Sequence, residues 1–178
     1  MVNLPASEEA FIGNWPEPVP RLSDAISGDY DSSLSSVGAV ALMAALLGRN
    51  LNHIHRPDPQ DDEHDLNGEF WKRHRAYDNI LLNAALSLPS HLRMPAGIGD
   101  PNVMFCNLAM HTCTISLHQT AIFKAEKNKL PNRIIMESKR RCIVAADQTC
   151  SVLKMICHLD LSGVSMSQSL PKRIQWLI

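Results

Sequence analysis

The sequence predicts an all-α protein, and three observations support that class. Aromatic residues make up only 5% of the chain, whereas alanine, leucine, methionine and isoleucine, which suit helix packing, are plentiful. Apolar residues recur at steps of three and four over four long stretches, as they do along a buried helix face. A chain of 178 residues is long enough for one domain that buries about 70% of its unfolded surface. We therefore expect an irregular array of about four main helices.

Residues 1–33 are predicted to form an acidic loop segment rich in proline and serine. Six acidic residues face a single arginine there, and four prolines interrupt the segment, which is typical of loops and linkers. Near its start, Ser7 follows Pro5 closely and is placed to cap a short helical turn.

The first main helix is predicted from Ser35 or Ser36 to about His55. Pro57 follows and ends it, because proline disfavours helical geometry in the residue before it. The apolar residues that mark this helix by their spacing are Val37, Val40, Ala41, Ala44, Leu47, Leu51 and Ile54.

The second main helix is predicted from about Leu66 to Leu88. Residues 58–65 before it hold five acidic residues in eight, which indicates a solvated loop whose last residue, Asp65, caps the helix. Pro89 stops the helix. The residues expected towards the core are Phe70, Tyr77, Leu81, Ala84, Ala85 and Leu88. Those expected largely outward are Lys72, Arg73, Arg75 and Asp78.

The third helix begins with the strongest start signal in the chain. Asp100 is placed as a capping residue, and Pro101 occupies the first helical position. The stretch Val103–Asn132 is the longest apolar helix-like run, and its apolar residues cover most of the helix circumference. A helix of that kind is expected to be buried on nearly all sides.

The fourth helix is predicted from about Arg133 to Leu161. One apolar stripe along it consists of Ile143, Ala146, Cys150, Leu153 and Cys157. Ser162-Gly163 forms a stop signal. Helical periodicity is lost beyond it, so residues 164–178 are expected to form an atypical tail.

Charge and cysteine content exclude several classes of function. A formal net charge of −1 gives the chain no overall attraction to nucleic acid or to an anionic membrane. Seven basic residues against two acidic ones between Lys124 and Arg141 indicate a solvated surface, with the acidic loops of the same chain as partners. The five cysteines fit reduced core thiols in an intracellular compartment. The apolar run Val37–Leu47 is too short to cross a bilayer, so no membrane partner is expected.

Two groups of residues have the chemistry of a site, and structural roles explain both better: a helix end with a hydrated acidic turn for the first, and buried packing for the second. His53 and His55, followed by Asp58, Asp61, Asp62, Glu63, His64 and Asp65, offer ligands for a divalent ion, but their spacing matches no known motif. His111 and His118 lie seven residues apart near Ser116, without the turn that presents a catalytic serine. We therefore assign no catalytic, cofactor-binding or metal-binding residue.

Several stretches along the chain form an ordered set of motifs. The longest is Leu117–Pro131, LHQTAIFKAEKNKLP. The others are Leu4–Phe11, Gly48–Leu51, His55–Pro57, Leu66–His74, Leu88-Pro89 and His158–Ser162. Together they resemble the regulatory (middle homology) region of fungal zinc-cluster transcription factors of the xylanolytic-activator type. The motif residues, expected to act structurally, are Leu4, Pro5, Gly48, Arg49, His55, Pro57, Phe70, Trp71, Leu88, Pro89, Leu117, His118, Lys124 and Pro131.

The resemblance implies that residues 34–163 form the C-terminal part of a helical regulatory domain in a nuclear regulator of RNA polymerase II transcription. In this family a separate N-terminal module with six cysteines binds two zinc ions and contacts DNA. No such cysteine cluster occurs in this chain, so zinc and DNA belong only to that module. Homodimers, heterodimers and the transcription machinery are the partners implied.

The chain also departs from the family pattern, since it begins at the Leu-Pro segment in the middle of the region. We therefore expect a fragment whose third and fourth helices leave apolar faces uncovered. Two alternatives remain open: a helical ligand-sensing or scaffold module without a transcription role, and a small hydrolase that uses His111 or His118.

Overall fold

The computed structural model describes residues 2–28, 34–56, 58 and 61–161 and confirms the all-α class. Within these residues there are six α-helices and one 3-10 helix, and the backbone pairing between Asn3 and Arg21 is an isolated bridge. The helices are α1 (Glu8–Gly13), α2 (Leu22–Ser27), α3 (Ser36–His55), α4 (Glu69–Ser87), η1 (Ser90–Leu92), α5 (Pro101–Lys127) and α6 (Asn132–Leu161). Pro57, Ser162-Gly163 and the predicted tail 164–178 lie outside the described residues.

The start signals read from the sequence act as expected at three helices. The side chains of Ser7, Ser35 and Asp100 accept hydrogen bonds from backbone N–H groups in the first turns of α1, α3 and α5. The second main helix starts later than predicted, because Gly68 occupies its cap position. The Asp65 carboxylate accepts from the N–H of Asn67 instead, and so stabilises a turn before α4.

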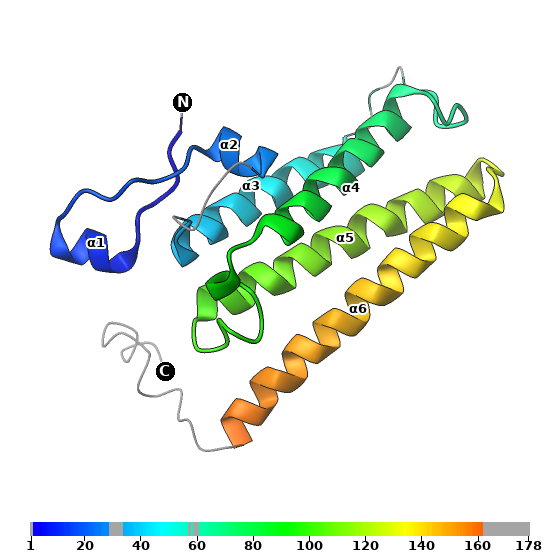
Figure 1. The fold of residues 1–178 in the computed structure, drawn as a ribbon. Helices are drawn as coiled ribbons and strands as arrows, with labels where there is room; N and C mark the ends of the chain where they lie inside the picture. The colour runs from blue at the N-terminus through cyan, green and yellow to red at the C-terminus, as the bar shows by residue number, and fades with distance from the viewer. Residues whose placement is uncertain (1, 29–33, 57, 59–60, 162–178) are drawn as a thin grey trace.

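Helix α5 lies at the centre of the array, and α3, α4 and α6 all pack against it (Figure 1). The short loop after α5 folds the chain back, so α6 runs antiparallel along it (Figure 1). The larger core cluster joins α3, α4, η1 and α5 through side chains such as Leu42, Met43, Leu92 and Leu117. A smaller core cluster, made of Phe70, Trp71, Ala121 and Ala125, lies towards the α5–α6 turn.

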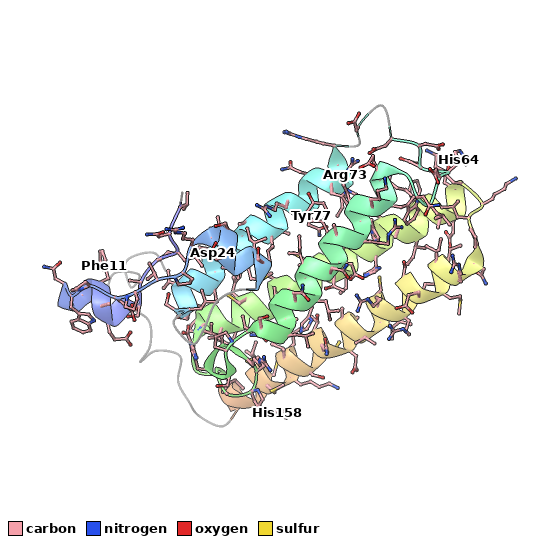
Figure 2. All side chains as sticks on the ribbon, turned by 45° about the horizontal axis from the view of Figure 1, so that its top comes forward. Phe11, Asp24, His64, Arg73, Tyr77 and His158 are labelled. Atoms are coloured by element: carbon pink, nitrogen blue, oxygen red, sulfur yellow. The ribbon has the colours of Figure 1, made fainter. Side chains whose placement is uncertain are left out.

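The prediction of a loop over residues 1–33 is corrected at Leu22–Ser27, which form the short helix α2. Its apolar residues Leu22, Ala25 and Ile26 have helical spacing, and the last two are buried in the main core. Leu4 is buried beside them, with its N–H donating to the carbonyl of Pro20 at 2.9 Å. Composition alone missed this helix because tertiary contacts, rather than intrinsic propensity, stabilise so short a segment. Phe11 on α1 lies away from the long helices (Figure 2).

The orientation of α6 differs from the prediction. Its buried residues are Ser138, Ala145 and Val152, whereas Ile143 of the predicted stripe is 69% exposed and Leu153 is 47% exposed. Helix α6 therefore packs a different side against α5 from the one predicted. Ile134 and Ile135 are half-buried on that side as well and pack against the smaller core cluster.

Helix α5 is also less enclosed than predicted. Cys106, Cys113 and Leu117 on its inner side are fully buried. Phe105 is 50% exposed and Phe123 is 66% exposed on its outer side. The helix is therefore covered by three neighbours and open along one strip.

Helix α3 is longer and more apolar than the run considered in the sequence. An 18-residue window within its 20 residues reaches a mean hydropathy of 1.2, so by length and composition alone it qualifies as a membrane span. One such helix is weak evidence, because the core helix of a soluble protein passes the same test.

A matched pair of valines on α6 tests its orientation. Val152→Ala removes a buried side chain and should lower the free energy of unfolding by about 1–3 kcal/mol. Val144→Ala, on the exposed side of the same helix, should change it by less than about 0.5 kcal/mol. Urea unfolding followed by circular dichroism measures both, and equal costs would contradict the orientation.

Candidate functional site

A buried cluster of histidine and aromatic rings lies where α3, α4 and α5 meet. The imidazole of His53 stacks on Phe70 with ring centroids 4.8 Å apart and an interplanar angle of 21°. Tyr77, which lies between α3 and α4 in Figure 2, approaches His53 with a centroid distance of 5.2 Å. The predicted inward residues of α4 thus form the wall of this cluster.

The cluster continues through edge-to-face contacts to α5. Trp71 meets Phe70 at 5.1 Å and His74 at 5.7 Å between ring centroids. His74 then meets His118 of α5 at 5.4 Å. Such contacts add to the stabilisation from area burial, so the three helices are joined by one continuous set of rings.

His118 connects this cluster to an ion pair with α6. Its Nε2 lies 3.2 Å from Asp78 Oδ1, and its Nδ1 lies 3.4 Å from Ser138 Oγ. Arg141 donates to both carboxylate oxygens of Asp78, at 2.6 Å to Oδ2. Burial alone would raise the pKa of Asp78, but the hydrogen bonds from His118 and Arg141 lower it to about 2. The expected outward position of Asp78 is therefore wrong, because this carboxylate is half-buried between α4 and α6.

Ser138, His118 and Asp78 have the composition of a catalytic triad, but the geometry does not suit catalysis. Ser138 and His118 are both buried, and neither lines a described groove. The Asp78 carboxylate is already neutralised by Arg141. A nucleophile needs access to substrate and donors for the developing charge, so this trio is suited to packing. Sequence reasoning missed Ser138 and Asp78, since neither forms a motif with His118.

A second ion pair connects the acidic loop to the end of α5. Lys124 is buried, pairs with the Glu63 carboxylate and lies 4.6 Å from the centroid of the Phe70 ring. The Trp71 indole N–H donates to the Glu63 carbonyl at 3.0 Å. The acidic loop considered as a partner of the basic stretch is found at this contact. The expectation of a solvated surface is wrong for Lys124, which is buried.

The motif residues fall into two groups in the structure. Those buried are Leu4, Phe70, Trp71, Leu88, Leu117, His118 and Lys124. Those exposed are Pro5, Gly48, Arg49, His55 and Pro131, while Pro89 is half-buried. The buried group supplies the contacts described above.

The structure separates the residues considered as metal ligands. His53 faces the ring cluster and is buried, whereas His55 at the end of α3 is exposed. His64 lies in the loop near the α5–α6 turn (Figure 2). In the described part of the chain, no three histidine, cysteine, aspartate or glutamate side chains are grouped to hold a metal ion.

The residues considered for hydrolysis are also apart. Ser116 faces α3, where its hydroxyl accepts from the Asn50 amide at 3.0 Å, while His118 faces α4 and α6. His111 is half-buried and lines the groove between α4 and α6. Neither histidine is therefore near the serine considered as its nucleophile.

The prediction of core thiols holds for part of the cysteines. Cys106 and Cys113 are fully buried, and burial raises their pKa values to about 12 and about 11. Cys150 and Cys157 are exposed on α6, so the prediction is wrong for them. Their stripe faces solvent because the side of α6 that carries Ser138, Ala145 and Val152 packs against α5.

An open groove of about 520 Å³ lies between α4 and α6, with α5 below it. Its apolar walls include Leu82, Leu86 and Val144. Arg93, Arg140 and the Asp78–Arg141 ion pair also line it. A second hollow of about 440 Å³ lies between α3 and α5. Both have the size of a ligand site, though neither is an enclosed cavity.

Comparison with known proteins relates this all-α chain to transcription regulation. Over 120 residues, or 66% of the chain, the sequence is 27% identical to transcription factor tazR of Aspergillus terreus. The chain spans about a fifth (19%) of that protein's length. No protein-family model and no solved structure matches it. The chain is therefore similar to part of a fungal transcription factor.

The buried histidines predict a loss of stability in mild acid. Burial, aided by the charges of Arg73 and Lys124, lowers the pKa of His53 to about 4. Burial and the neighbouring histidines lower that of His74 to about 3. The unfolded chain therefore binds more protons below pH 6.5, the usual pKa of histidine. The free energy of unfolding should fall by about 1.4 kcal/mol per pH unit for each histidine as the pH drops from about 6.5 towards 4.

Urea unfolding at a series of pH values measures this slope. His53→Leu should reduce it, because leucine does not titrate and both ring nitrogens of His53 lack a hydrogen-bond partner within the described residues. Asn52→Leu, an exposed position one residue away, should leave the slope unchanged. An unaltered slope in His53→Leu would contradict the prediction.

The Asp78–Arg141 pair predicts an asymmetric mutational cost. Arg141→Met leaves a half-buried carboxylate without its main partner and should cost about 1–3 kcal/mol of unfolding free energy. Replacing both partners, with Asp78→Leu added, should recover part of the loss. Arg133→Met, at an exposed position on α6, serves as the control in the same unfolding assay.

Proposed function

We propose that this chain is a non-enzymatic helical regulatory domain of a fungal zinc-cluster transcription factor. The observation that carries the proposal is the similarity to transcription factor tazR over 120 residues. The resemblance of Leu117–Pro131 to the regulatory region of that family supports it, because this stretch forms the end of α5 and its connection to α6.

The contacts of the motif residues support a regulatory rather than a chemical role. Phe70, Trp71, His118 and Lys124 interact with one another or with the shared neighbour His74 across α4 and α5. A rigid, mutually packed set of this kind transmits a change at one helix to the next, since packed cores are not continuously deformable. The domain would act in the nucleus and modulate transcription by RNA polymerase II.

The proposal assigns DNA contact and zinc to a six-cysteine module outside this sequence. With a formal net charge of −1, the helical chain has no strong electrostatic attraction to DNA. Its own partners would be a second regulatory chain and components of the transcription machinery, and no membrane is involved.

The groove between α4 and α6 favours a ligand-sensing module as the second candidate. Its apolar walls and the nearby Arg93 would suit an apolar ligand with an acidic group. A domain that senses a ligand could also regulate transcription. The two candidates therefore share one structure and differ only in whether the chain changes transcription. The hydrolase alternative has less support, since His118 and Ser116 face different helices.

A tethering experiment tests the proposed function. Residues 1–178 fused to an unrelated DNA-binding module should change the output of a reporter gene several-fold in a fungal host, relative to that module alone. Leu117→Asp places a charge in the core and should abolish the effect. Gln119→Asp, an exposed position on α5, should retain it. Output equal to that of the DNA-binding module alone would contradict the proposal.

A further inference from the structure

The groove between α4 and α6 contains one arginine that no carboxylate of the described residues neutralises. Three arginines and one acidic residue, Asp78, line it. Arg141 is paired with Asp78, and Arg140 is paired with Glu137. Within the part of the chain that the structure describes, Arg93 has no such ion pair. The groove therefore carries an uncompensated positive charge at Arg93.

The guanidinium of Arg93 is held in place by the end of α4. Its Nε donates to the carbonyl of Leu88, and its Nη2 donates to the carbonyl of Leu86. A guanidinium has five N–H groups in a planar fork, so three remain for other acceptors, on Nη1 and Nη2. Two neighbouring donors of this kind match the two oxygens of a carboxylate. The orientation of Arg93 thus leaves a bidentate donor for an anion.

The backbone that carries Arg93 is fixed as well. Arg93 follows η1, in the connection that leads from α4 to the start of α5 (Figure 1). Leu92 is fully buried, and its carbonyl accepts from the side-chain amide of Asn107 at 3.0 Å. The backbone N–H of Arg93 donates to the carbonyl of Ser90 at 3.2 Å. Binding to a group that is already ordered costs little conformational entropy, so the position of Arg93 favours a ligand site.

The apolar walls of the groove are aliphatic. The described lining contains no phenylalanine, tyrosine or tryptophan. Its apolar side chains include Leu82, Ala85 and Leu86 of α4, Met110 of α5, and Val144 and Met155 of α6. Methionine is flexible and adapts its shape to varied apolar partners. The walls therefore suit an aliphatic chain better than an aromatic ring that needs a stacking partner.

The two ends of the groove differ in charge. Along α4 the lining extends from Asp78 to Leu88, which corresponds to about 15 Å at 1.5 Å per residue. The neutralised Asp78–Arg141 pair lies at one end. Arg93 lies at the other end, where it contacts the last carbonyls of α4. A ligand with one charged end and one apolar chain would therefore bind in a single direction.

We propose that the groove binds an aliphatic monocarboxylate, with its carboxylate on Arg93 and its chain between α4 and α6. The carboxylate supplies the missing countercharge, and the chain removes apolar wall surface from water. An aliphatic amine would place a like charge beside Arg93 and is rejected. This inference deepens the ligand-sensing form of the proposed function and rests on the same groove.

Calorimetric titration of the 178-residue chain with decanoate tests the proposal. We expect one saturable site per chain. Decanoate should bind at least about tenfold more tightly than 1-decanol, which has the same chain without the charge. Both ligands are used below the concentrations at which they aggregate. The absence of saturable binding, several weak sites per chain, or equal affinities for the two ligands would overturn the proposal.

Arginine variants test where the carboxylate binds. Arg93→Gln should weaken decanoate binding at least about tenfold and change decanol binding less than about twofold, since only the charged anchor is lost. Arg140→Gln removes an arginine that is already paired with Glu137 and should leave decanoate binding unchanged. Circular dichroism shows that each variant remains folded. Equal effects of the two variants on decanoate binding would assign the carboxylate elsewhere and overturn the arrangement.

A pair of tryptophan variants tests the groove without changing Arg93. Val144→Trp fills the groove from an exposed valine of its wall and should abolish binding of both ligands. Ile143→Trp, at an exposed neighbour outside the described lining, should bind as the wild type does. Retained decanoate binding in Val144→Trp would overturn the proposal. Calorimetry needs no reporter gene, so loss of the ligand site with retained reporter output would refute this inference and leave the proposed regulatory role intact.

Discussion

The fold depends on the burial of α5, which packs against α3, α4 and α6 on three sides. Its 27 residues carry buried side chains towards α3, α4 and α6. Removal of apolar surface from water is the main force that holds such an array together. The order of the other elements follows from this requirement, since α3 and α4 cover one part of α5 and the antiparallel α6 covers another.

Polar contacts then determine how these helices are aligned. The half-buried Asp78–Arg141 pair joins α4 to α6, and the Lys124–Glu63 pair joins α5 to the loop before α4. Hydrophobic packing is non-directional, whereas charge-assisted hydrogen bonds need a specific geometry. The two ion pairs, with His118 between α4 and α6, therefore select one alignment among several that would bury similar apolar area.

The histidines illustrate how burial can give a packing role to residues that have the chemistry of a site. At the sequence level His53, His111 and His118 were candidates for metal binding or catalysis. Within the fold, His53 stacks on Phe70 and His118 is placed between Asp78 and Ser138. Both of these imidazoles are thereby removed from solvent, whereas His111 lines the open α4–α6 groove.

The sequence by itself determined the class, the extents of α3 and α6 and the start of α5. Apolar spacing, Ser35, Asp100 and Pro101 act within a few residues of the chain, so local patterns were sufficient to place α3 and α5 and to predict α6 to within about a residue. Only the tertiary structure decided which stripe of α6 is buried, because both stripes have helical spacing and the choice depends on the shape of α5. The short helix α2 and the site contacts of Asp78 and Ser138 likewise depend on residues distant in the sequence, and no local pattern encodes such contacts.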